Sequence, residues 1–319
     1  MYSWIKKILF ALPPELAHDV SMRFLNIMHA CKVTKIFPQI LAPIKVMDLL
    51  FKNPIGLAAG LDKNGDYIDA LAALGFGFIE VGTVTPKPQS GNPKPRLFRF
   101  PQEEAIVNRM GFNNKGIDHL VTQVKKAKFR GILGINIGKN RDTPIEKAVD
   151  DYVFCFRRAA AVASYITLNI SSPNTPSLRQ LQHNELLTNL LKTLKHEQAQ
   201  QKKYVPLVVK ISPDMTSEEI NNLAQLLLAE KIEGVIATNT TIHHSFEQGG
   251  LSGKPLMARS TEVVKELYSV LKNQIPIIAC GGVFTQEDVQ AKFSAGASLV
   301  QIYSGLIYRG PEVIATILR

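Results

Sequence analysis

The chain has 319 residues, of which 45% are hydrophobic, so it can bury a substantial core and is not a disordered chain. Its 37 Lys and Arg residues exceed its 27 Asp and Glu residues, and the formal net charge of +10 favours anionic partners: phosphate groups, carboxylate substrates, anionic lipid or nucleic acid. No motif typical of RNA or DNA binding accompanies this charge, so we expect no nucleic-acid partner.

Cysteine content and hydropathy indicate the redox compartment of the protein and its relation to the membrane. Cys31, Cys155 and Cys280 are far apart and form no C-x-x-C pair, which favours buried thiols in a reducing compartment over a metal or redox site. No run approaches the roughly 18 apolar residues that a membrane-spanning helix requires. We therefore expect a chain that does not cross a membrane, although it can still bind to the surface of one.

Two short amphipathic helices are predicted at the N-terminus. Over residues 1–12 the apolar residues recur at helical spacing, with Lys6 and Lys7 off the apolar stripe. A second apolar stripe, over residues 17–31, follows a pair of prolines and completes a helical hairpin. Either both stripes cover the core, or the hairpin, with Trp4 beside two lysines, binds at a membrane interface.

From Asn53 onward, short apolar runs alternate with amphipathic stretches, which is the pattern of parallel β/α units. The runs begin near Ile55, Phe78, Ile132, Tyr165, Pro206, Gly234, Pro276 and Ser298, with helical patterns such as 145–163 and 217–231 between them. Eight units in about 265 residues predict an α/β protein of the (β/α)₈ TIM-barrel type over residues 41–319, preceded by a hairpin domain of residues 1–40. A doubly wound open sheet is the alternative, but its G-x-G-x-x-G turn after the first strand is absent.

Residues 85–112 interrupt the alternation between the second and third runs. This segment is rich in Pro and Gly and is too long for a plain connection. We expect it to form an insertion over the mouth of the barrel.

Polar residues or glycines follow all eight predicted strands. They are Lys63, Thr83, Asn136, Asn169, Lys210, Thr238 with Asn239, Gly281 with Gly282, and Tyr303 with Ser304. Active sites of this fold lie at the C-terminal ends of the strands, so the repetition predicts one composite site. The glycines and serine after strands seven and eight stand where such barrels commonly bind phosphate through backbone N–H groups and a short helix N-terminus, which favours a phosphate-bearing cofactor.

The stretch 167–179, TLNISSPNTPSLR, is the strongest local candidate for chemistry. A buried strand runs into a loop of Ser, Thr and Asn residues that contains Pro173 and Pro176. Each proline fixes φ and removes a backbone donor, so the loop presents its hydroxyls and amides from a stiffened backbone. An ordinary Ser/Pro-rich turn is the alternative interpretation.

Six further motifs accompany this loop: GLAAGLDKNG from Gly56, EVGTVTPKPQ from Glu80, NRMGFNN from Asn108, GINIGKN from Gly134, ATNTT from Ala237 and VQIYSG from Val300. Together they resemble the dihydroorotate dehydrogenase family over nearly the whole chain. Serine in NISSPNTP, where the cytosolic class has cysteine, makes the chain similar to the membrane-associated, quinone-reducing class 2. The resemblance implies oxidation of dihydroorotate to orotate in pyrimidine biosynthesis, with one FMN per chain as hydride acceptor and quinone as final electron acceptor. It also implies peripheral binding to an anionic membrane surface, on the cytoplasmic side of the inner cell membrane.

The resemblance further implies roles for individual residues. FMN is expected against Ala59, Gly60, Leu61, Asp62, Lys63, Thr83, Asn136, Asn169, Lys210, Thr238, Gly253, Gly282, Tyr303 and Ser304. Dihydroorotate is expected against Lys63, Asn108, Arg109, Met110, Gly111, Phe112, Asn169, Asn174, Asn239 and Thr240. Ser172 is the expected base at ring carbon five, with a proton relay through Thr175 and water beside Phe112, and His18 and Arg99 are expected near the quinone path.

Some of these expectations also have a physical basis. Asparagine carries a donor and an acceptor in one side chain, which suits a ring that presents amides, and a cation at Lys210 can stabilise the negative charge of a reduced flavin. Serine is a weak base, and no His, Asp or Glu lies near Ser172 in the sequence to activate it. The sequence also departs from many class 2 relatives, because the segment 241–250 is several residues shorter and Ser177 stands where they often have glycine.

Two other functions are compatible with a barrel of this composition. A Schiff-base aldolase would use Lys210 as a desolvated nucleophile. A peripheral membrane scaffold with an inert barrel would bind no cofactor and turn over no substrate. A yellow flavin colour distinguishes the flavoprotein from both.

Overall fold

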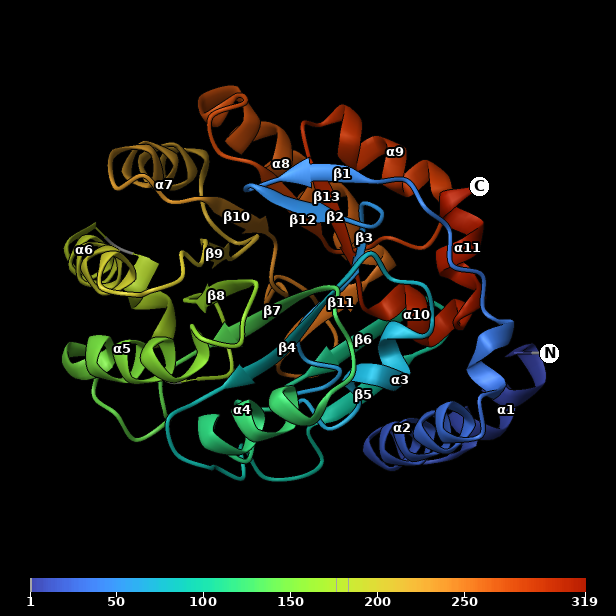
Figure 1. Ribbon diagram of the computed structural model, residues 1–319. Coiled ribbons are helices and arrows are strands. Elements are labelled where there is room, and N and C mark those ends of the chain that lie inside the picture. The colour runs from blue at the N-terminus through green and yellow to red at the C-terminus, as the bar shows by residue number, and fades with distance from the viewer. Residues whose placement is uncertain (1, 176, 183) are drawn as a thin grey trace.

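The computed structural model describes residues 2–175, 177–182 and 184–319, so Met1 and Pro176 of the patterns above lie outside the described residues. Eight parallel strands close into a barrel with helices around it (Figure 1). The barrel strands are β3 (Ile55–Leu57), β4 (Phe78–Val84), β7 (Ile132–Ile137), β8 (Tyr165–Asn169), β9 (Leu207–Ile211), β10 (Gly234–Ala237), β12 (Ile277–Cys280) and β13 (Leu299–Ile302). They are neighbours in chain order, and β13 pairs with β3 to close the ring. The predicted (β/α)₈ barrel is confirmed, and the open sheet is excluded.

The barrel strands are buried on both faces, which explains why they read as continuous apolar runs. All seven residues of β4 are buried, and its register with β7 runs from Phe78 opposite Ile132 to Gly82 opposite Asn136. At the N-terminal end of the barrel, a hairpin of β1 (Ile44–Val46) and β2 (Leu49–Phe51) closes the opening. The ring of Phe51 meets that of Phe78 edge to face, with centroids 5.1 Å apart.

An outer layer of helices covers the strands. It comprises α3 (Ile68–Ala72), α4 (Ile117–Lys126), α5 (Ala148–Ala159), α6 (Asn184–Ala199), α7 (Ser217–Ala229), α8 (Met257–Leu271), α9 (Gln286–Ser294), α10 (Ser304–Arg309) and α11 (Glu312–Leu318). The predicted helix 145–163 is shorter than expected, because a 3₁₀ turn over Ile145–Lys147 precedes α5 and the chain turns toward β8 after Ala159. A capping box of Thr216 and Glu219 fixes the start of α7.

The predicted insertion forms a small antiparallel sheet. Strands β5 (Leu97–Phe100) and β6 (Ala105–Asn108) come from the segment after β4, and β11 (Gly250–Gly253) joins β6 from the loop after β10. Asn108 therefore pairs with Leu97 on one side and with Gly250 on the other. This sheet carries residues 108–112 to the mouth of the barrel.

The N-terminal hairpin consists of α1 (Tyr2–Ala11) and α2 (Pro14–Ala30), and it stands against one side of the barrel near β5 and α10 (Figure 1). Helix α1 buries no residue, and α2 buries only Ala17 and Met22. The hairpin is held by the Tyr2 hydroxyl, which donates to the carbonyl of Ile307 at 2.5 Å, and by Arg99, which donates to three carbonyls over residues 9–12. Most of the two apolar stripes is therefore left outside the core.

Within the described residues, the longest apolar helical stretch falls short of what is needed to cross a bilayer.

Candidate active site

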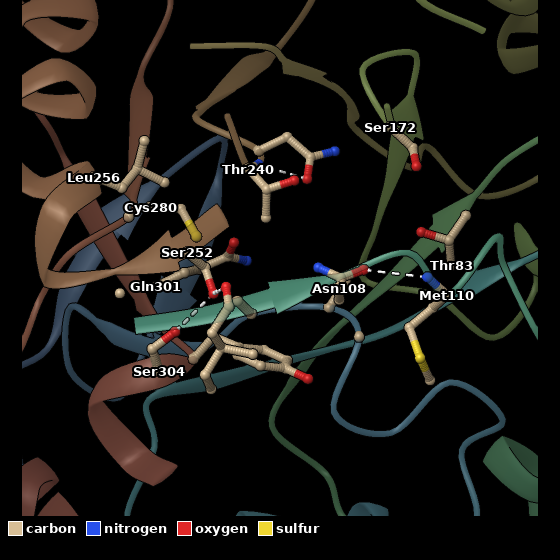
Figure 2. A pocket seen from close by; sticks show the side chains of 18 of the residues that line it. Thr83, Asn108, Met110, Ser172, Thr240, Ser252, Leu256, Cys280, Gln301 and Ser304 are labelled. Carbon is tan, nitrogen blue, oxygen red and sulfur yellow. Dashed lines mark hydrogen bonds between the residues drawn. The ribbon is translucent and has the colours of Figure 1, made fainter. Parts of the chain in front are cut away.

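One cavity opens at the C-terminal ends of the barrel strands. Strand ends and the loops after them supply Lys63, Thr83, Asn169, Ser172, Lys210, Thr238, Gly282 and Tyr303, and the inserted sheet supplies Asn108 and Ser252. Figure 2 shows Ser172 and Thr83 at one side of this cavity and Cys280, Ser252 and Ser304 at the other. Segments that are up to about 250 residues apart in the chain thus converge, as the composite site predicts.

Most of the candidate residues line this cavity. They are Ala59, Gly60, Lys63, Thr83, Asn108, Met110, Gly111, Phe112, Asn169, Ser172, Asn174, Lys210, Thr238, Asn239, Thr240, Gly253, Gly282, Tyr303, Ser304 and His18. The six others, Leu61, Asp62, Asn136, Arg109, Thr175 and Arg99, do not line it.

Those six residues have other contacts. The carboxylate of Asp62 accepts hydrogen bonds from three backbone amides of the turn that follows it, and Arg109 donates to the carbonyl of Pro95 at 2.9 Å. Thr175 is buried, and its hydroxyl has no hydrogen-bond partner among the described residues. Leu61 and Arg99 line a second cavity, which is described below. Asn136 lies in the barrel interior.

The loop after β8 presents Ser172 and is held by asparagines from three segments. The Ser172 Oγ accepts a hydrogen bond from the amide of Asn174 at 3.3 Å, and Asn174 in turn donates to the carbonyl of Asn108 at 3.0 Å. Asn239 donates to Asn169 Oδ1 at 3.2 Å and to Ser171 Oγ at 3.1 Å. In the described part of the chain, no His, Asp or Glu side chain hydrogen-bonds to Ser172, so no acidic or basic side chain takes a proton directly from this serine.

Two lysines bring positive charge into the cavity. Lys63 donates to the carbonyl of Gly60 at 2.9 Å, and burial lowers its pKa to about 8. Lys210 is almost fully buried, and its ammonium group makes no hydrogen bond or ion pair with the described residues. The ammonium group of Lys210 is therefore open to the cavity and available to an acceptor or an anion there.

Glycines on one side of the cavity leave backbone open. Gly282 has φ +75°, and a Cβ there would lie 2.4 Å from the Cα of Met257. Gly253 has φ +102°, and a Cβ there would lie 2.2 Å from the carbonyl oxygen of Glu104. Within the described residues, the amides of Gly281 and Gly282 donate to no protein acceptor. These residues fit a phosphate group, because free amides in a left-handed glycine turn form a concave donor surface for an anion.

A buried polar network beneath the cavity fixes its floor. The carboxyl group of Glu80 accepts hydrogen bonds from Asn136 at 2.7 Å, Gln301 at 2.8 Å and Tyr165 at 2.9 Å. Asn136 also accepts from Thr83 at 2.6 Å, and Thr83 accepts from Asn169 at 2.8 Å. Such a network makes the side chains at the floor rigid, since every donor that moved would leave a buried partner unpaired.

Several cavity residues were not predicted from the sequence. Ser252 lies on β11 and shares a hydrogen bond of 3.0 Å with Ser304, and Gln301 lies on β13 with an unpaired buried Oε1 (Figure 2). Glu15 reaches the cavity from α2. The available signal was a polar residue inside an apolar run, which applies to Gln301 and to Glu80 but not to Ser252 or Glu15.

A second cavity, of about 480 Å³, lies between the hairpin and the barrel. It is mostly apolar and is lined by residues of both hairpin helices together with Leu61, Leu71, Arg99 and Ile307. His18, Leu97, Ile106 and Tyr303 line both cavities and form a shared wall. Burial, and then the charge of Lys63, lower the pKa of His18 to about 4, so this imidazole is neutral near pH 7.

Known proteins resemble this chain over its full length. A family model described as dihydroorotate dehydrogenase matches residues 41–319. A dihydroorotate dehydrogenase (quinone) of Nitrosospira multiformis is 54% identical over 99% of this chain and 94% of its own length, and one of Acinetobacter baylyi is 55% identical over 98% and 97%. A crystal structure of the Eimeria tenella enzyme in complex with ferulenol superposes with a TM-score of 0.87 at 37% identity, covering 98% of this chain and 93% of that one.

Proposed function

The chain belongs to the dihydroorotate dehydrogenase family, in its quinone-dependent branch, and we propose from this premise how its residues perform the reaction. The protein is an oxidoreductase that oxidises dihydroorotate to orotate in pyrimidine biosynthesis and passes the electrons to quinone. Because the chain belongs to this family, the two alternative functions, a Schiff-base aldolase and a membrane scaffold, are rejected. The observation that carries the residue-level proposal is the single cavity in which Ser172, two lysines and four asparagines meet.

The family is flavin-dependent, and we propose FMN as the flavin of this chain. The free amides of Gly281 and Gly282 suit its phosphate group, and the unpaired ammonium group of Lys210 suits the ring system. The predicted contacts at Ala59, Gly60, Lys63, Thr83, Asn169, Thr238, Gly253, Tyr303 and Ser304 line the same cavity. Held by these residues, FMN would supply an acceptor for the hydride of ring carbon six and a donor of two electrons for quinone.

The protein residues bind the substrate and move its proton. Lys63 binds the carboxylate of dihydroorotate, and Asn108, Asn174 and Asn239 bind the amide edges of its ring, because each asparagine offers a donor and an acceptor. Ser172 removes the proton from ring carbon five. The proton then leaves through Thr175 and water beside Phe112, and the unpaired hydroxyl of Thr175 supports this route.

We propose that residues 1–40 form a membrane and quinone module attached to the FMN-binding barrel of residues 41–319. Quinone is apolar and dissolves in the membrane, so its path must open at the bilayer surface and stay apolar toward the flavin. The second cavity supports this role, since both hairpin helices line it and it shares a wall with the first. His18 and Arg99 lie along it and can donate hydrogen bonds to a quinone oxygen. On this basis the protein attaches peripherally to the cytoplasmic side of the inner cell membrane.

A visible spectrum tests the function directly. The purified protein is expected to be yellow and to lose the flavin absorbance when dihydroorotate is added without oxygen, and the absorbance is expected to return when quinone is added. A colourless protein that takes up no added FMN, or a yellow protein that dihydroorotate does not bleach, would overturn the proposal.

A further inference from the structure

A partly buried ion pair joins the hairpin to the substrate end of the barrel. Glu15 lies in the first turn of α2, and Arg96 directly precedes β5. One guanidinium nitrogen of Arg96 donates to Glu15 Oε1 at 2.7 Å, and a second donates to the same oxygen at 3.2 Å. Arg96 is 8% exposed, whereas the Glu15 carboxylate is partly exposed and lines the first cavity. Three hydrogen bonds from two guanidinium nitrogens to one carboxylate fix the geometry of the pair.

Arg96 also holds the turn over residues 90–92. Its remaining nitrogen donates to the carbonyl of Ser90 at 2.6 Å and to that of Asn92 at 2.9 Å. A planar guanidinium that serves a carboxylate and two carbonyls at once has little freedom to reorient. The position of this turn is therefore tied to the position of Glu15 on the hairpin.

Asn92 connects that turn to both substrate-binding segments. Its side-chain amide donates to the carbonyl of Arg109 at 2.9 Å and to that of Asn174 at 3.3 Å, and its backbone amide donates to the carbonyl of Met110 at 3.0 Å. The side chain also packs on Gly111, where an added Cβ would lie 2.8 Å from it. If the turn over residues 90–92 moved, the 108–112 segment and the Ser172 loop would both lose hydrogen bonds or move with it.

Glu15 and Lys63 line the same cavity, and the charge of Glu15 raises the pKa of Lys63. The charged or titratable groups around Lys63 are Arg96 from just before β5, Glu15, His18 and Asp19 from α2, and Asp62 from its own loop. The charge of Arg96 lowers the pKa of Lys63. Among the groups that raise this pKa, Glu15 has the largest effect. Glu15 thus offsets the positive charge that Arg96 brings to the substrate carboxylate site.

We propose that Glu15 is a positioning residue for dihydroorotate oxidation, which acts through Arg96 to brace the substrate-binding segments and makes substrate binding in the barrel depend on the docked hairpin. The inference rests on the proposed role of the cavity in binding dihydroorotate. A hairpin that served quinone alone would not need a carboxylate at this place.

The test uses full-length, flavin-loaded protein. Flavin bleaching by dihydroorotate without oxygen gives the substrate dissociation constant and the reduction rate at saturation for the wild type, Glu15→Gln and Glu15→Asp. Asp19→Asn is the matched control, because it removes the same charge from the same helix, and Asp19 makes no hydrogen bond or ion pair with the described residues.

Glu15→Gln is expected to weaken dihydroorotate binding by roughly 2- to 30-fold, the range usual for residues that act through a contact network, with a smaller change in the saturated rate. The loss of affinity at alkaline pH is expected to move to lower pH, because Lys63 then loses its proton more easily. Glu15→Asp is expected to recover part of the affinity. Asp19→Asn is expected to keep wild-type affinity below the pKa of Lys63 and to move the alkaline decline less than Glu15→Gln does, because the charge of Asp19 raises the pKa of Lys63 less than that of Glu15.

Three results would overturn the inference: unchanged substrate affinity and pH profile in Glu15→Gln, an equal loss in Asp19→Asn, or a defect confined to quinone turnover. If the Glu15→Gln protein loses its flavin, Arg96→Lys supplies the second test. Lysine keeps the positive charge but cannot make the paired hydrogen bonds of a guanidinium group. Arg96→Lys is expected to weaken substrate binding as well. Wild-type affinity for dihydroorotate in this variant would count against the inference. A wild-type protein that dihydroorotate fails to bleach would instead overturn the proposed function.

Discussion

At the scale of single residues, Ser172 occupies the cavity without an acidic or basic side-chain partner in the described chain. Ser172→Ala is expected to slow flavin reduction by about 10²- to 10⁴-fold, the usual contribution of a positioned general base. Orotate binding is expected to be nearly unchanged, because the asparagines that hold the ring are kept. Single-turnover absorbance measurements give the rate, and an orotate titration gives the affinity.

Ser177→Gly is the control for this variant. Ser177 is exposed on the same loop and has φ +56°, a conformation that glycine adopts at no cost, so the loop should keep its shape. Its reduction rate is expected to match the wild type. A Ser172→Ala rate within a few-fold of wild type would show that another group takes the proton.

Lys63 should impose a pH dependence on substrate binding. Its pKa is about 8, because burial and then Arg96 lower it while Glu15 and two aspartates raise it. The ammonium group is present below this value and is lost as the pH rises through it. Orotate affinity is therefore expected to be constant on the acid side and to fall above about pH 8.

Lys63→Ala tests the same assignment. Orotate binding below the pKa is expected to weaken by about 1.5 to 3 kcal/mol, the value of a charge-assisted hydrogen bond, and its alkaline dependence is expected to disappear. Titration of the flavin absorbance with orotate across pH measures both effects. Wild-type affinity in the variant, or the same alkaline decline, would refute the role of Lys63.

At the scale of elements, strands were easier to predict than side-chain partners. The barrel strands could be predicted because each is apolar on both faces, so their pattern does not depend on distant contacts. Strand β11 could not be predicted, because its sequence, GLSG, has little strand propensity. It forms a strand by pairing with β6, which lies far away in the sequence. Glu15 could not either, since an acid in the first turn of a helix usually serves the helix dipole alone.

Helix α1 leaves large apolar side chains exposed on its outer side. Trp4 is 72% exposed and Ile8 is 70% exposed. Replacing both with Gln is expected to weaken liposome binding by less than the ~1.5 to 3 kcal/mol per residue that full burial would provide. Flavin reduction by dihydroorotate is expected to stay intact, while turnover of long-tailed quinone falls. Liposome sedimentation and paired quinone assays measure these effects.

Leu50→Gln is the matched control for that variant. Leu50 is 69% exposed, but it lies on the β2 hairpin at the opposite end of the barrel. Its replacement is expected to leave liposome binding unchanged. An equal loss of liposome binding in both variants would indicate nonspecific hydrophobic adsorption rather than binding through helix α1.

At the scale of the whole molecule, the net charge of +10 predicts salt-sensitive attachment to anionic membranes. Lys6 and Lys7 are each expected to contribute about 1 kcal/mol near anionic headgroups. Raising the salt concentration to about 1 M shortens the screening length to about 3 Å, so binding to anionic vesicles is expected to weaken strongly and binding to neutral vesicles only slightly. Equal affinity for both kinds of vesicle at low salt would contradict the electrostatic contribution.

The wall shared by the two cavities, formed by His18, Leu97, Ile106 and Tyr303, has a consequence for inhibition. We expect the first cavity, which is the more polar of the two, to admit molecules that resemble orotate, and the second to admit molecules that resemble quinone. If so, inhibitors of these two chemistries are expected to occupy one protein molecule at the same time, and each is expected to compete with a different substrate. A resistance substitution deep in the hairpin cavity would therefore leave sensitivity to an orotate analogue unchanged.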